Sequence, residues 1–481
     1  MMNTSLKEEF IKQAIEGHLR NLGRYPADRF PIQRASTHTN LGNAYLSLAS
    51  ICDREANLKN AIDCYQQSLL IYSAECLPHN FARVQNNLAN AIVSLASVRR
   101  SPENLAKAID LYKQSLRIRS VTDFPSDFAD TQNNLGIAYR ELANHENLEQ
   151  NLHEAIKHFE EALKVHTKKR SPFHFAGIQN NLGNAYFVLA KTSRNPQSDL
   201  RRAIECYLAA LTVFTERQYP TEFAGVQKNL GNAYAALGEL QADEKVFRDA
   251  IDCYNNSLRI TGKKSFPIEY ATTNSELGIA YTKLAAIGDR QTNLEKAIAL
   301  SKEAIVVLKE QNIPLRIGGV YYNLGIAYSA LAEVSEPEDN LRLAVEAYHC
   351  SLEARRSEDD PTGFASAQNN LGNQYCKLSE LQEGVDKAKS LDNARRLLHS
   401  ALDARIQRGI ELDVAMTENN LGNVYRALAS ISDRQLNLVK AIEHYENALR
   451  LFKDQRDSTT RDVVEGSVAR LKEELKGLGP A

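Results

Sequence analysis

Asparagine is the residue type whose spacing in this sequence suggests a chemical role. A first series contains Asn40, Asn87, Asn134, Asn181, Asn229, Asn323, Asn370 and Asn420. A second series stands three residues further on, at Asn43, Asn90, Asn184, Asn232, Asn373 and Asn423. A carboxamide carries two N–H donors and a carbonyl acceptor. A row of such groups on one face predicts a surface that holds the N–H and C=O groups of an extended peptide.

These asparagines need an explanation, because on a helix Asn is less favourable than Lys, Glu or Gln by roughly 0.3–0.5 kcal/mol per residue. One interpretation is a ligand-binding ladder made by both series. The other is an internal ladder, in which each asparagine bonds its own helix or the neighbouring repeat and sets the stacking register. A further column stands at Asn86, Asn133, Asn180, Asn369 and Asn419. Both interpretations stay open, and the two roles can coexist.

The asparagine pattern is interrupted in one stretch of the chain. Glu276 replaces an asparagine of the first series, and Ile279 and Ile326 replace two of the second. Tyr321 and Tyr322 add aromatic surface beside them. The stretch predicts a side-chain pocket that would add specificity to the ladder, with Tyr322 as a binding residue. Ordinary drift between repeats is the alternative.

Residue patterns typical of catalysis or metal binding are missing from the sequence. The eleven histidines lack ligand spacing, and no Cys-x-x-Cys occurs. A nucleophilic triad or a phosphate-binding glycine loop is not indicated either. We therefore predict no enzymatic activity, no cofactor and no metal. Basic clusters at 168–170, 263–264 and 355–356 suit helix C-termini, or else the docking of an acidic partner.

Composition and charge narrow the cellular setting. The 481 residues include 58 Lys and Arg against 60 Asp and Glu, a net charge of -2. No bulk field draws such a chain to nucleic acid or to an anionic membrane. No run of eighteen apolar residues occurs, and the N-terminus carries charge throughout. We expect a cytoplasmic protein whose seven cysteines are free, mostly buried thiols.

The asparagines belong to a longer motif, Asn-Leu-Gly-Asn-Ala-Tyr at 40–45, which occurs nine times with small variations. Its leucine stands at 41, 88, 135, 182, 230, 277, 324, 371 and 421, a spacing of 47 residues that stretches once to 48 and once to 50. Self-similarity at such a period predicts a stack of identical supersecondary units rather than separate globular domains.

Each repeat predicts two helices. Leu41, Ala44, Tyr45 and Leu48 follow helical spacing, and a second stripe of the same kind begins at Leu58. Prolines at 31, 78, 125, 172, 220, 267, 314 and 361 suit the opening turn of the first helix. Asparagines such as Asn57 and Asn151 are expected as N-caps of the second helix. Glycines inside the first helix, such as Gly42, predict a close helix–helix approach.

The predicted organisation is a capping half-repeat at 1–29, nine tandem repeats at 30–458, and a capping helix and tail at 459–481. At the start, Ile11, Ala14, Ile15 and Leu22 match a lone second helix. At the end, Val464, Val468 and Leu471 match a lone first helix. Terminal half-units with polar outer faces keep a one-dimensional stack soluble.

The order Leu-Gly-x-Ala-Tyr followed by Ala61, Tyr65 and Ser68 resembles the tetratricopeptide repeat, lengthened from the usual 34 residues. The string FPSDFADTQNNLGIAYRELA is similar to repeat arrays of bacterial CHAT-domain proteins and of kinesin light chain. Two features limit the resemblance: the tryptophan typical of the standard repeat is absent from the sequence, and no catalytic domain is expected after the repeats. The resemblance implies an all-α, right-handed α-solenoid (superhelix) that serves as an interaction scaffold and grips peptide backbones.

The predicted function is therefore a non-catalytic scaffold that binds a protein or an extended peptide in its concave groove, with no nucleic acid and no membrane as partner. Two rivals belong to other classes. One is a regulatory or sensor subunit of a caspase-like CHAT protease system. The other is a self-assembling structural array. The sequence does not fix the oligomeric state.

Overall fold

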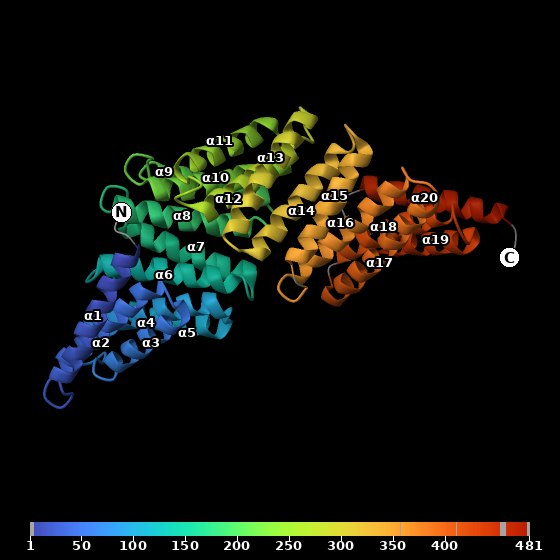
Figure 1. The fold of residues 1–481 in the computed structure, drawn as a ribbon. Coiled ribbons are helices and arrows are strands. Elements are labelled where there is room, and N and C mark those ends of the chain that lie inside the picture. The colour runs from blue at the N-terminus through green and yellow to red at the C-terminus, as the bar shows by residue number, and fades with distance from the viewer. Residues whose placement is uncertain (1–3, 356, 410, 453–457, 479–481) are drawn as a thin grey trace. The chain divides into compact units, whose positions relative to one another are not determined.

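Twenty α-helices follow one another along the chain in the computed structural model, which describes residues 4–355, 357–409, 411–452 and 458–478 (Figure 1). No strand occurs within those ranges. Arg356, part of one basic cluster, lies outside them. The first helices of the pairs are α2 (Pro31–Ala49), α4 (Pro78–Arg99), α6 (Pro125–Ala143), α8 (Pro172–Leu189), α10 (Pro220–Gln241), α12 (Pro267–Leu284), α14 (Pro314–Leu331), α16 (Pro361–Ser379) and α18 (Glu411–Leu428).

The second helices alternate with them. They are α3 (Arg54–Leu69), α5 (Pro102–Leu116), α7 (Leu148–Val165), α9 (Pro196–Leu211), α11 (Glu244–Ile260), α13 (Arg290–Glu310), α15 (Pro337–Ala354), α17 (Gly384–Arg408) and α19 (Arg434–Leu451). Helices α1 (Thr4–Arg24) and α20 (Ser458–Gly477) stand alone at the two ends. The eight predicted prolines each begin a first helix, so the fixed φ of proline marks these starts as expected.

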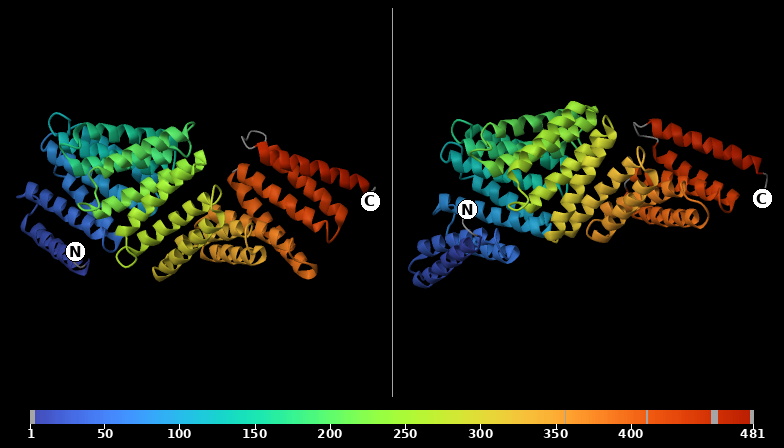
Figure 2. Two further views of the ribbon diagram at one scale, coloured as in Figure 1. Left: turned by 90° about the horizontal axis from the view of Figure 1, so that it is seen from above. Right: turned by 45° about the horizontal axis from the view of Figure 1, so that its top comes forward.

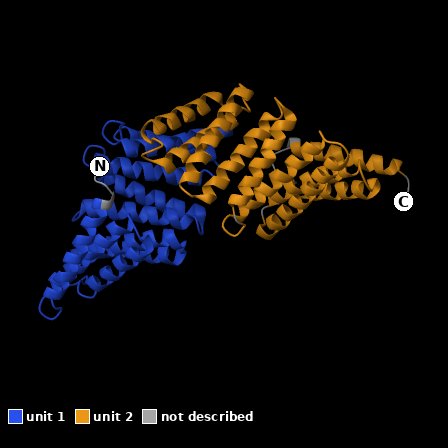
Figure 3. Cartoon of the chain, viewed as in Figure 1, with its two compact units in different colours: residues 1–240 blue, residues 241–481 orange. Residues whose placement is uncertain are grey.

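Two compact units divide the chain, residues 1–240 and residues 241–481 (Figure 3). In the first unit, each helix from α1 to α8 packs on the next one along the chain. In the second unit, the same holds from α11 to α20. The further views of Figure 2 show neighbouring helices side by side within each unit. Successive first helices, such as α4 and α6, also contact each other. This succession of contacts between near neighbours in the chain is the packing of a helical solenoid.

The apolar stripes of the two helices form the core of each unit. Leu58, Ala61 and Tyr65 of α3 are at most 1% exposed, as are the corresponding residues of α7, Leu152, Ala155 and Phe159. Ile15 of α1 packs with Leu41 and Leu48 of α2. Val464, Val468 and Leu471 of α20 join the core of α18 and α19. These end contacts agree with capping helices, while the division into nine repeats and two caps stays a prediction.

The predicted N-caps of the second helices are wrong. Each of these helices begins earlier than expected, so Asn57 lies inside the first turn of α3. Its Nδ2 donates to the backbone O of Cys52, at 2.9 Å, and Asn151 donates in the same way to Glu146 O at 2.8 Å. The residue before α3, Asp53, has a φ of 44° and makes no side-chain cap. These buried asparagines therefore hold the connection between the helices in place.

The helical glycines allow the close approach that the sequence predicts. A Cβ built on Gly42 would lie 2.7 Å from Cε1 of Tyr65, and one on Gly136 would lie 2.7 Å from Cε1 of Phe159. Both distances are shorter than any van der Waals contact, so the aromatic ring of the second helix rests directly on the backbone of the first. Size is the reason for glycine at these sites, because the φ values there are ordinary helical ones.

Candidate peptide-binding surface

The first asparagine series links successive first helices through its side chains. Nδ2 of Asn134 in α6 donates to Oδ1 of Asn86 in α4, at 3.4 Å. The same bond runs from Asn181 to Asn133 at 3.1 Å and from Asn229 to Asn180 at 3.0 Å. Each amide thus donates to the helix pair that precedes it. The further column of asparagines supplies the acceptors, which is the arrangement that the internal-ladder interpretation describes.

Variants of this link occur at other helices. Nδ2 of Asn87 donates to Asn43 Oδ1, at 3.2 Å. In the second unit, Asn420 donates to Asn369 Oδ1 at 3.1 Å, and Asn370 donates to the hydroxyl of Tyr322 at 3.1 Å. Tyr322 therefore stands where an acceptor asparagine stands elsewhere. Asn40 is exposed and Asn323 is half-buried.

The second asparagine series accepts hydrogen bonds from tyrosines of the second helices. The hydroxyl of Tyr65 donates to Asn43 Oδ1 at 2.7 Å, and that of Tyr207 donates to Asn184 Oδ1 at 2.7 Å. Two more pairs repeat this contact: Tyr112 with Asn90 at 2.5 Å and Tyr445 with Asn423 at 2.7 Å. The ring of each tyrosine lies against the glycine of the first helix, or against Ala89 in one pair. Its hydroxyl therefore reaches the asparagine that directly follows this small residue.

Burial fixes the direction of these bonds. Loss of solvent raises the pKa of Tyr65 and Tyr207 well above the usual tyrosine value, and raises the pKa of Tyr445 to about 12. The hydroxyls therefore stay protonated and donate. With Oδ1 engaged, each asparagine turns its amino group away from the ring.

The amino groups of these asparagines are not used in bonds to the described part of the chain. Among the described residues, none accepts a hydrogen bond from Nδ2 of Asn43, Asn90, Asn184 or Asn423. These side chains are half-buried, and no Nδ2 among them is both buried and unpaired. Asn232 and Asn373 occupy the same register and are half-buried too.

The aromatic partner explains some of the gaps in the second series. Where the second helix carries Phe159, which has no hydroxyl, the first helix carries Ile137 instead of asparagine. Ser301, which also replaces the tyrosine, stands opposite Ile279. Leu398 breaks this pairing, because it stands opposite Asn373, and Tyr348 breaks it too, because Ile326 occupies the asparagine position. Its ring packs edge-on against Tyr322, with centroids 5.8 Å apart. The co-occurrence of tyrosine and asparagine, which are bonded in at least four of the repeats, is the feature of the sequence that could have indicated this contact.

The predicted pocket near Tyr321 and Tyr322 is only partly assembled. Tyr321 lines a cavity with Leu324 and Tyr328, whereas Tyr322 faces Asn370 and lies 5.7 Å from the guanidinium carbon of Arg355. Neither Ile279 nor Ile326 lines that cavity. The two adjacent tyrosines therefore serve different surfaces.

The described residues show neither a cluster of metal ligands nor a membrane-spanning helix. They contain no group of three or more His, Cys, Asp or Glu side chains placed to hold a metal ion. None of the described helices has both the length and the hydropathy needed to cross a bilayer. All seven cysteines are free, and Cys64, Cys253 and Cys376 are buried.

One segment of the chain is similar to a known protein family. Residues 35–75, which span most of α2 and all of α3, match the family model described as tetratricopeptide repeat. The search of curated proteins found no match to the chain.

Several solved structures are similar in fold. One is a signal transduction ATPase with numerous domains and a tetratricopeptide repeat sensor, from Pyrococcus horikoshii. It has a TM-score of 0.50 and 16% identity over 99% of this chain and 68% of that one. Another is the C-terminal part of a repeat-containing protein from Cytophaga hutchinsonii, with a TM-score of 0.42 and 16% identity over 67% of this chain and 98% of that one. By the matched segment and the fold, the chain is an all-α solenoid of tetratricopeptide-like repeats.

Proposed function

We propose that the protein is a non-catalytic scaffold that binds an extended peptide, or an extended segment of a protein, along the asparagine face of its first helices. The observation that carries this proposal is the row of amide N–H donors at Asn43, Asn90 and Asn184 in the first unit. Their Oδ1 atoms bond buried tyrosines, and their Nδ2 atoms have no acceptor among the described residues.

The arrangement determines which ligand groups this face would recognise. Because tyrosine hydroxyls occupy the carbonyl oxygens, the face offers donors rather than a mixture of donors and acceptors. Backbone C=O groups of an extended chain are acceptors that recur along its length. A row of fixed donors would hold them with little dependence on the peptide sequence. The first asparagine series has a supporting role here, since its own donors link the helices.

The test exploits the difference between the two atoms of the amide. Changing Asn90 and Asn184 together to Asp keeps an acceptor for Tyr112 and Tyr207 but removes the N–H donors and adds negative charge facing peptide carbonyls. The control is Asn60→Asp, which makes the same chemical change at an exposed position of α3, outside the asparagine face. The probe is the tightest binder from a library of unstructured 12-residue peptides, measured by fluorescence anisotropy.

We expect the Asn90→Asp/Asn184→Asp protein to bind the probe at least about fivefold more weakly, since each of the two lost hydrogen bonds is worth roughly 0.5–1.5 kcal/mol. The Asn60→Asp control should bind like the parent. Helicity and melting temperature should stay close to the parental values in both. Unchanged affinity in the double variant would remove the peptide-binding role from these asparagines. The two rival functions, a regulator of a caspase-like protease and a self-assembling array, stay predictions.

A further inference from the structure

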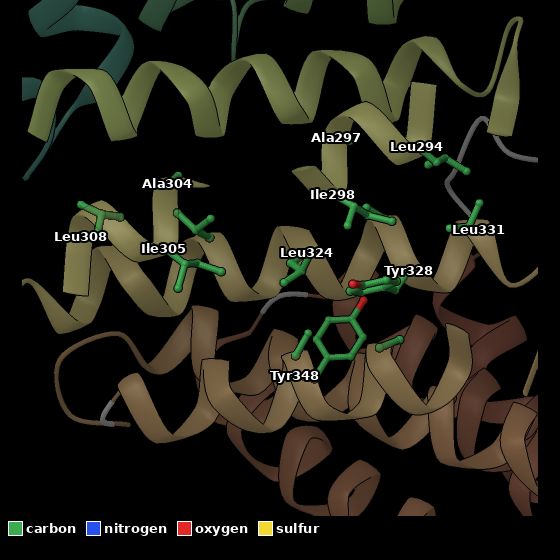
Figure 4. Close-up of a cluster of buried hydrophobic side chains, with 14 of the residues drawn as sticks. Leu294, Ala297, Ile298, Ala304, Ile305, Leu308, Leu324, Tyr328, Leu331 and Tyr348 are labelled. Atoms are coloured by element: carbon green, nitrogen blue, oxygen red, sulfur yellow. The ribbon is translucent and has the colours of Figure 1, made fainter. Parts of the chain in front are cut away.

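A second surface lies on the opposite side of α14 from Asn323 and Ile326. There α13, α14 and α15 line a partly open cavity of about 320 Å³. Its walls include Ile305 of α13, Tyr321, Leu324 and Tyr328 of α14, and Ala347 and Cys350 of α15. Figure 4 shows Ile305, Leu324 and Tyr328 close together between these helices. A volume of this size is at the lower end of the range for small-molecule sites.

The repeats provide an internal comparison for this cavity. A hollow of about 350 Å³ occupies the corresponding place between α8 and α9, lined by Gln179, Arg202 and Cys206. By repeat register, these three positions correspond to Tyr321, Leu343 and Ala347 of the cavity. A hollow at this place thus occurs in more than one repeat. In the repeat of α14 and α15, its wall is more aromatic and apolar.

The same change removes polar contacts found in other repeats. In the second helix pair, Gln85 Nε2 donates to Gln114 Oε1, at 2.5 Å. Tyr321 and Cys350 occupy those two positions in the seventh pair. Ala347 stands where Leu111 and Leu300 fill the space in other repeats. The loss of a polar pair and of a bulky side chain together opens an apolar space.

Cations lie over the aromatic wall of the cavity. Nζ of Lys302 is 5.5 Å from the ring centroid of Tyr328, and Nζ of Lys309 is 5.5 Å from that of Tyr321. Glu346 is the only carboxylate among the residues that line the cavity. An aromatic wall with two nearby ammonium groups favours a ligand that has an aromatic ring and a negative charge.

We propose that this cavity binds a small aromatic molecule that carries an anionic group, with the ring against Tyr321 and Tyr328 and the anion at Lys302. The site is independent of the asparagine face, because it lies on the other side of α14 and in the second unit. A ligand there would contact α13, α14 and α15 at once, and so would stabilise their packing.

The test uses 8-anilinonaphthalene-1-sulfonate, an aromatic sulfonate whose fluorescence rises in an apolar site. The Ala347→Leu variant should fill the cavity with a side chain that other repeats accommodate at this position. We expect it to bind the dye at least tenfold more weakly than the parent does, with unchanged circular dichroism. The matched control is Cys206→Leu in the polar hollow, which should bind like the parent. Equal affinity in the parent and Ala347→Leu proteins would overturn the proposal.

Two further measurements locate the ligand. Lys302→Gln should lower dye affinity several-fold and reduce its dependence on salt, because an ion pair is screened by salt. Saturating dye should slow the alkylation of Cys350 by iodoacetamide, with exposed Cys76 as an internal reference in mass spectrometry. If the dye leaves the alkylation of Cys350 as fast as before, or if Lys302→Gln binds like the parent, the assigned site is wrong.

Discussion

The contact between Tyr207 and Asn184 allows a quantitative test of how each repeat is held together. The Tyr207 hydroxyl donates to Asn184 Oδ1 at 2.7 Å, and Tyr207 is 1% exposed. Replacing Asn184 by Ala leaves that buried hydroxyl without its acceptor, at a cost of about 1–3 kcal/mol. The better helix propensity of alanine offsets about 0.5 kcal/mol of this. We expect a net loss of about 0.5–2.5 kcal/mol.

The third helix pair lacks the hydrogen bond between tyrosine and asparagine and has apolar residues at both positions. Phe159 stands in the place of Tyr207, and Ile137 stands in the place of Asn184. Tyr207→Phe alone should cost less than Asn184→Ala, because the asparagine is half-buried and its Oδ1 can bond water. The pair Asn184→Ile/Tyr207→Phe leaves no buried polar group unpaired. It should be more stable than Asn184→Ile alone by at least about 1 kcal/mol.

The test requires a measurement of stability at α8 and α9 themselves. A solenoid can unfold in parts, and a single denaturation midpoint for the whole chain then does not report the stability of one repeat. Hydrogen exchange of the α8 and α9 amides reports the free energy of opening at the site. Circular dichroism in denaturant complements it, since the chain has no tryptophan to follow. The reasoning is refuted if Asn184→Ile costs the same free energy in the parent protein as in the Tyr207→Phe variant.

Three further predictions follow from other contacts. Gly183→Val should destabilise α8 and α9 by at least about 1–3 kcal/mol, because a Cβ there would lie 2.7 Å from Tyr207 Cε1; melting by circular dichroism checks this. Asn151→Ala should speed hydrogen exchange around Glu146, whose carbonyl loses its 2.8 Å bond, while the exposed Asn60→Ala should not. Burial lowers the pKa of His158 from 6.5 to about 4, so the folded chain binds fewer protons than the unfolded chain between these values. Stability should therefore fall by up to about 3 kcal/mol as pH drops through this window, and His158→Leu should flatten the pH dependence of the denaturation midpoint.

The sequence predicted the fold well because the strongest signals in it are local and repeated. The helical spacing of the apolar residues and the prolines at the helix starts depend on neighbours in the chain. The prediction failed at Asn57, where the side chain donates to Cys52 O instead of capping the helix. Propensity alone does not show which of the two nearby backbone groups a carboxamide will bond.

The candidate site was harder to predict, because its chemistry depends on contacts between helices. The sequence placed Asn43 and Asn87 on one face and left open whether they bond a ligand or the neighbouring repeat, but it did not show that these two bond each other. It also grouped Tyr321 with Tyr322, although adjacent residues on a helix point about 100° apart. Such partners become visible only when the packing of the helices is known.

Each amide bond between first helices runs from a donor asparagine to an acceptor in the preceding first helix. This regularity affects how such a chain can gain or lose repeats. Asn134 donates to Asn86, and Asn181 donates to Asn133, so each joint uses the same donor and the same acceptor. Removal of residues 126–172 would bring Asn181 opposite Asn86, and the new joint would have the chemistry of the two that it replaces. Duplication or loss of a 47-residue segment could therefore pass through a folded intermediate at every step. Inheritance of whole repeats requires no compensating substitution at these joints.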